Sequence, residues 1–193
     1  MSMKIIRYIL ILAVVGLGAF WLYQMKPREV PEPKVKEIIK NIPTKPDPQN
    51  MTYDVEGDTF VVKNGYGENP IPDSLTKSTL NVFDSMYGDL DGDGDTDAAV
   101  WLVNDPGGTG RFFYGAFIIN NNGVSKATNS IFLGDRIAPQ NINIKDGRAV
   151  YNFSERGPND PMSADPSIGA SIWAYYDKNT NEMKEWVKNS DTN

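Results

Sequence analysis

The residues best suited to chemistry in this chain are five aspartates in one short acidic segment. The segment reads Gly-Asp-Leu-Asp-Gly-Asp-Gly-Asp-Thr-Asp over residues 88–97, so an acid stands at every second position. Carboxylates this close repel one another unless a hard cation neutralises them, and Gly94, at position 6 of the loop, permits the sharp turn that directs alternate oxygens inward. We therefore predict that one structural calcium ion is bound by the side chains of Asp89, Asp91, Asp93 and Asp97 and by the backbone carbonyl of Asp95.

Calcium is favoured over magnesium, because a flexible cage made only of oxygens suits six to eight ligands at about 2.3–2.6 Å. The segment is not an EF-hand. An EF-hand loop has a bidentate Glu at position 12, where this chain has Val100, and the residues on both sides have the composition of strands rather than helices. The alternative is a solvated acidic turn that holds no ion.

Two residue types are absent from the sequence, Cys and His. Their absence excludes disulfides, thiolate zinc sites, cysteine nucleophiles, Ser-His-Asp triads and imidazole metal sites. The net charge is −6, and residues 51–193 carry 21 acidic against 11 basic side chains with no basic stripe. An acidic body repels a phosphate backbone, so we expect no binding to nucleic acid.

Without His, catalysis near neutral pH would need a carboxylate or Lys with a strongly shifted pKa. We therefore expect a domain that is not an enzyme. The alternative is a carboxylate-dependent hydrolase acting on envelope carbohydrate or peptidoglycan, because paired carboxylates can cleave glycosidic bonds. Its candidate residues lie in an acid-rich and base-rich stretch: Asp135, Glu155, Asp160 and Asp165.

The N-terminal segment is apolar. Residues 8–23 carry no charge and, with their flanks, would span roughly 24–28 Å as a helix, close to the bilayer core of about 30 Å. We predict an uncleaved single-pass membrane anchor over residues 1–26, with a cleaved signal peptide as the alternative. Residues 27–50 contain six prolines, which favour an extended, semi-rigid linker.

Residues 51–193 are predicted to form one mainly β domain, an antiparallel sandwich or a partly closed barrel. Short runs rich in β-branched and aromatic residues alternate with Gly, Asn, Asp and Pro, and Asp146-Gly147 is the clearest hairpin turn. Residues 100–103 are apolar on both faces, which indicates a central strand. The ten predicted strands cover residues 51–55, 59–63, 76–87, 98–104, 111–119, 124–132, 142–145, 148–153, 170–176 and 183–187.

The acidic segment, with the Ala-Ala-Val that follows it, resembles the calcium loop of FG-GAP repeats, the blades of integrin-type propellers. A propeller needs several copies and this chain has one, so that resemblance covers the loop and not the fold. A longer resemblance is to a family of uncharacterised exported bacterial β-proteins, and it implies export and one folded unit but no reaction. It rests on motifs at residues 88–99, 107–114, 133–140, 156–162 and 166–169.

These observations predict a membrane-anchored, extracytoplasmic β domain with a binding or scaffolding role at the cell envelope. Its expected contacts are the membrane, through the N-terminal helix, and an unknown envelope protein or glycan. The glycine loop at 107–110 has no helix after it to cradle a phosphate, so we expect a hairpin loop at the end of the sheet opposite the acidic segment.

Overall fold

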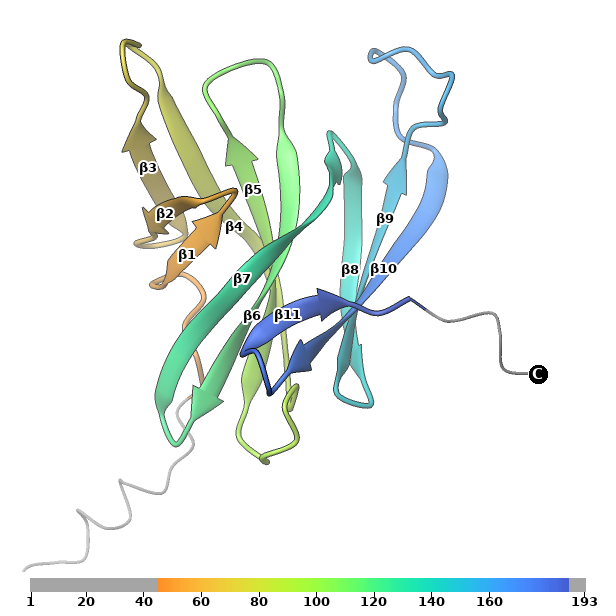
Figure 1. The fold of residues 1–193 in the computed structure, drawn as a ribbon. Coiled ribbons are helices and arrows are strands. Elements are labelled where there is room, and N and C mark those ends of the chain that lie inside the picture. Colours follow the sequence, from red (N-terminus) through yellow and green to blue (C-terminus); the bar gives the residue numbers. More distant parts are fainter. Residues whose placement is uncertain (1–44, 188–193) are drawn as a thin grey trace, which may run out of the picture. The chain divides into compact units, whose positions relative to one another are not determined.

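Eleven strands and no helix make up the part of the chain that the computed structural model describes, residues 45–187 (Figure 1). The mainly β class is confirmed, and each of the ten predicted strands overlaps an observed one. The strands are β1 (Thr52–Val55), β2 (Asp58–Val61), β3 (Tyr66–Pro70), β4 (Lys77–Gly88), β5 (Asp97–Asp105), β6 (Phe112–Asn121), β7 (Val124–Asp135), β8 (Ala138–Lys145), β9 (Arg148–Glu155), β10 (Ile168–Asp177) and β11 (Glu182–Glu185).

The predicted anchor over residues 1–26 and the linker up to residue 44 lie outside the described residues. Within residues 45–187, no helix long and apolar enough to cross a bilayer is found. The last six residues assigned to the linker are attached to the β domain. Pro46 and Pro48 are buried, and the Tyr53 hydroxyl donates a hydrogen bond to the Pro48 carbonyl (2.8 Å).

Seven strands form a nearly closed barrel in the order β2-β1-β7-β6-β5-β4-β3. Its two edge strands approach each other, and the Asn69 side-chain amide on β3 donates to the Thr59 carbonyl on β2 across the seam (3.0 Å). The pairing of β1 with β7, at Asp54 and Asn129, is parallel, so the prediction of a wholly antiparallel domain is wrong there. Parallel pairing needs a long connection, and the five strands between β1 and β7 provide it.

The other four strands form a second, antiparallel sheet in the order β11-β10-β9-β8. In Figure 1 this sheet lies beside the barrel, on the side of β5, β6 and β7. The β8–β9 turn is the predicted hairpin, and both of its central residues have positive φ, 51° at Asp146 and 68° at Gly147. A type I′ turn requires that geometry, so the Asp-Gly prediction is confirmed.

Strand β5 contributes to both hydrophobic cores, which is why its apolar residues do not alternate with polar ones. Val100 and Leu102 belong to the core inside the barrel, whereas Trp101 and Val103 belong to the core between the barrel and the second sheet. The Trp101 ring meets the Tyr151 ring of β9 edge to face, with centroids 5.2 Å apart at 89°. The prediction of a central strand with two buried faces is confirmed.

Gly115 on β6 lies directly under the Tyr151 ring. A Cβ atom at this position would stand 2.8 Å from the Tyr151 Cζ atom, whereas a Cβ at Gly169 on β10 would meet nothing within 4 Å. We expect Gly115→Ala to lower the free energy of unfolding by about 1–3 kcal/mol through overpacking. The matched Gly169→Ala should change it by less than about 0.5 kcal/mol. Denaturant unfolding of the full chain measures both, and equal effects would contradict this packing.

Candidate metal centre

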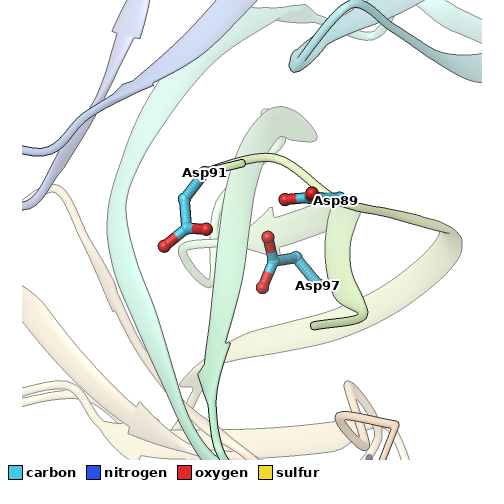
Figure 2. A group of neighbouring side chains, drawn as sticks. All are labelled: Asp89, Asp91 and Asp97. Carbon is cyan, nitrogen blue, oxygen red and sulfur yellow. The ribbon is translucent and has the colours of Figure 1, made fainter. Parts of the chain in front are cut away.

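The acidic segment connects β4 to β5 and brings three of its five carboxylates together (Figure 2). One carboxylate oxygen from each of Asp89, Asp91 and Asp97 lies within 4.8 Å of the others. The three side chains differ in exposure, because Asp89 is exposed, Asp91 is half-buried and Asp97 is buried. This group, hereafter the aspartate triad, is open to solvent on one side and anchored in the protein on the other.

Asp97, the first residue of β5, is the anchored member of the triad. Its side chain is fully buried and accepts two backbone hydrogen bonds, from the Leu90 amide (2.7 Å) and the Asn120 amide (2.9 Å). Burial raises the pKa of the Asp97 carboxyl above its ordinary value; the two amides oppose that rise and the nearby charge of Asp91 adds to it. One carboxylate therefore joins the acidic loop, β5 and the end of β6.

The other two members of the triad shape the loop itself. Asp89 accepts hydrogen bonds from the Gly92 amide (2.6 Å) and the Gly94 amide (3.1 Å), and Asp91 accepts one from the Asp93 amide (2.9 Å). Gly92 and Gly94 have φ values of 78° and 91°, a region that glycine enters without steric cost. The predicted sharp turn at Gly94 is therefore present.

Asp93 and Asp95 are not part of the triad. The Asp93 carboxylate accepts from the Asp95 amide (2.8 Å), and the Asp95 carboxylate accepts from the Asn122 amide in the β6–β7 turn (2.6 Å). The prediction for Asp95 concerned its backbone carbonyl, which these side-chain contacts leave unaffected. The Asp93 side chain and the Asp95 carbonyl stay predicted ligands.

The triad concentrates negative charge that the rest of the described domain does not neutralise. None of the ion pairs found among residues 45–187 involves Asp89, Asp91 or Asp97. Burial raises the pKa of Asp91; the hydrogen bond from the Asp93 amide and the charge of Lys178, which lines the same hollow as Asp91, oppose that rise. An all-oxygen group of this kind suits a hard divalent cation, which could bind to the solvent-facing side of the triad without displacing the two amides on Asp97.

The four carboxylates proposed for a hydrolase have varied surroundings. Asp135 forms an ion pair with Arg136 (Oδ2–Nη2 2.7 Å), and this bond holds the pKa of Asp135 below its ordinary value. Asp160 accepts a hydrogen bond from the Gly157 amide (2.8 Å), while Glu155 and Asp165 are exposed. Asp135 and Asp160 are thus hydrogen-bonded to neighbouring protein groups. The expectation that the domain is not an enzyme stays a prediction.

An aromatic surface on the second sheet was not predicted from the sequence. Trp173 and Trp186 have ring centroids 5.7 Å apart, and the Arg148 guanidinium lies 4.9 Å from the Trp186 ring centroid. With Ser171 they line a shallow hollow of about 550 Å³. The alternation of Ser171, Trp173 and Tyr175 along β10 is a signal that could have placed one of these tryptophans on the outer face.

Hydrogen-bonded polar side chains continue this surface across three strands. The Asn152 amide donates to the Asn141 side-chain oxygen (2.8 Å), and the Ser171 hydroxyl donates to the Asn152 side-chain oxygen (2.7 Å). The outer face of the second sheet thus carries a row of amide and hydroxyl groups that ends beside the tryptophan pair. Such a face combines flat apolar area with hydrogen-bonding groups.

Comparisons with models of known protein families, with curated proteins and with solved structures gave no match to this chain.

Asp97 has a structural role that does not require an ion. We expect Asp97→Ala, measured in a chelator, to lower the free energy of unfolding by about 2–5 kcal/mol, because two buried amides lose their acceptor. Asp93→Ala serves as the control, since its carboxylate accepts an exposed hydrogen bond within the loop. That control should change stability by less than about 1 kcal/mol. Similar losses in the two variants would show that Asp97 does not anchor the loop.

Proposed function

We propose that this chain is a membrane-anchored, extracytoplasmic protein whose β domain is stabilised by one calcium ion and has a binding or scaffolding role at the cell envelope. The observation that carries the proposal is the aspartate triad at the start of β5. Its carboxylates converge at the beginning of the strand on which both cores depend, and an ion there would stabilise that end of the barrel.

Calcium would act by relieving repulsion that folding creates. The folded chain brings three carboxylates within 4.8 Å, and the unfolded chain does not hold them together. An ion that binds only the folded form adds stability in proportion to RT ln(1 + [L]/Kd). The proposed affinity is in the range of about 10⁻⁴–10⁻³ M, which suits an extracellular structural site.

The location outside the cytoplasm is supported by three independent features. The apolar N-terminal stretch has the length of an anchor, a proline-rich stretch follows it, and the motifs of the chain resemble those of exported β-proteins. A weak calcium site also suits a compartment with abundant free calcium. The first two features favour a tethered domain, and the resemblance to exported proteins favours the outer side of the membrane.

The binding role is supported by the aromatic surface on the second sheet. Trp173 and Trp186 are half-buried and line one hollow, and aromatic side chains with a polar group are enriched at binding surfaces. The row of amide and hydroxyl groups beside the pair offers hydrogen bonds to a polar partner. An envelope glycan or a protein of the envelope would satisfy both features.

The experiment that tests the calcium site is thermal unfolding of the full chain in chelator and in graded free calcium. We expect the melting temperature to rise with calcium, by an amount that corresponds to about 2.7 kcal/mol at 100 times Kd. Asp89→Asn and Asp93→Ala should each remove most of the rise, because each leaves only three of the four carboxylates in the predicted ligand set and calcium binds best to several charged oxygens. The matched control is Asp165→Asn, an exposed aspartate far along the chain, and it should keep the full rise.

Identical melting curves for the wild-type chain in chelator and in millimolar calcium would refute the calcium site. A rise that survives Asp93→Ala but not Asp89→Asn would reduce the ligand set to the triad.

A further inference from the structure

A second hollow lies at the end of the barrel opposite the aspartate triad. The triad precedes the first residue of β5, whereas this hollow is lined by Asn104 and Pro106, where β5 ends. It has a volume of about 400 Å³, within the range of small-molecule sites, and β-barrel mouths are a common place for such sites. We refer to it as the barrel mouth.

Three aromatic rings form one side of the barrel mouth. The Phe132 ring centroid lies 5.5 Å from that of Tyr114 and 6.3 Å from that of Phe112. The rings are inclined at 60° and 54°, so they meet as adjoining walls and do not stack face to face. Phe132 contacts both of these rings and is still 51% exposed. Part of its apolar aromatic area is therefore open to a ligand.

Two carboxylates from the β1–β2 hairpin stand at the same hollow. Burial raises the pKa of Tyr114 to about 12, and the charge of Glu56 and its interaction with the Tyr114 hydroxyl add to this rise. Asp58 is paired across the hairpin with Val55, whose side chain belongs to the barrel core, so both side chains are directed to the barrel side.

No positive charge balances these acids at the barrel mouth. The side chains that line it include neither Lys nor Arg, and no ion pair found within residues 45–187 involves Glu56 or Asp58. Two carboxylates and three aromatic side chains therefore line one hollow that no Lys or Arg side chain lines. An anionic ligand would be repelled there, and the aromatic side chains favour a cation that also carries apolar surface over a bare metal ion.

We propose that the barrel mouth binds a small organic cation with an alkylated ammonium group. Aromatic rings attract such a cation through their quadrupoles, and the alkyl groups bury apolar area against the same rings. Glu56 and Asp58 supply the opposite charge. The site is independent of the calcium site, since it uses none of the same residues and lies at the other end of β5.

The test compares two ligands of nearly equal shape that differ in charge. Choline carries a quaternary ammonium, and 3,3-dimethylbutan-1-ol replaces its nitrogen with carbon. Binding to the full chain in a nonionic detergent, in chelator and at constant ionic strength, is followed by ligand-observed NMR titration. We expect choline to bind at least about tenfold more tightly than the neutral alcohol. Equal affinity of the two ligands, or no binding of choline, would overturn the proposal.

Variants then locate the binding at the barrel mouth. Phe132→Leu removes an exposed ring, and Glu56→Gln removes a charge while keeping an acceptor for the Tyr114 hydroxyl; each should weaken choline binding about fivefold or more. The matched control is Phe83→Leu on β4, whose ring is 55% exposed and does not line the hollow. The site would be refuted if Phe83→Leu weakened choline binding as much as Phe132→Leu does. It would also be refuted if neither Phe132→Leu nor Glu56→Gln weakened choline binding. Unchanged melting temperatures show that the variants fold.

Discussion

The buried carboxylate of Asp97 is the contact on which one end of this domain depends. It satisfies the backbone amides of Leu90 in the acidic loop and of Asn120 at the end of β6, and it does so at the first residue of the most buried strand. A buried charge is costly unless it is hydrogen-bonded, and these two amides meet that requirement. The same side chain belongs to the aspartate triad, so the fold and the candidate metal centre share one group.

The acidic loop is also ordered by hydrogen bonds between its own residues. Asp89, Asp91 and Asp93 each accept a hydrogen bond from an amide within the loop, and the Asp95 carboxylate reaches the β6–β7 turn. These bonds hold the loop in a conformation in which three carboxylates converge. An ion would then bind to a loop already shaped for it, so that little of its binding free energy is spent on ordering the chain.

Much of the fold could be predicted from the sequence because local patterns determine it. The hairpin at Asp146-Gly147 follows from turn chemistry, and the two buried faces of β5 follow from its unbroken apolar run. The parallel contact of β1 with β7 could not be predicted, since it joins segments about 75 residues apart and depends on how the barrel closes. Strand β3 was missed because Gly67 and Pro70 are poor strand formers, and it is the pairing with β4 that holds this segment extended.

The candidate sites, like the fold, could be predicted from the sequence only in part. The spacing of the aspartates indicates a loop able to gather oxygens, but it does not reveal that only Asp97 is buried or which amides it accepts. The barrel mouth carries no sequence signal, because Glu56, Tyr114 and Phe132 come from three separate segments that meet only when the barrel forms. The tryptophan pair likewise requires the register of β10 and β11.

The measurement that tests the role of Asp97 most directly is residue-resolved hydrogen exchange of the Leu90 and Asn120 amides, in chelator and in saturating calcium. If one buried carboxylate anchors both the fold and the ion, the two amides should be protected in chelator and should exchange more slowly still when calcium is added. Exchange of both amides at the rate of an unstructured peptide in chelator, or protection that calcium leaves unchanged, would contradict this account.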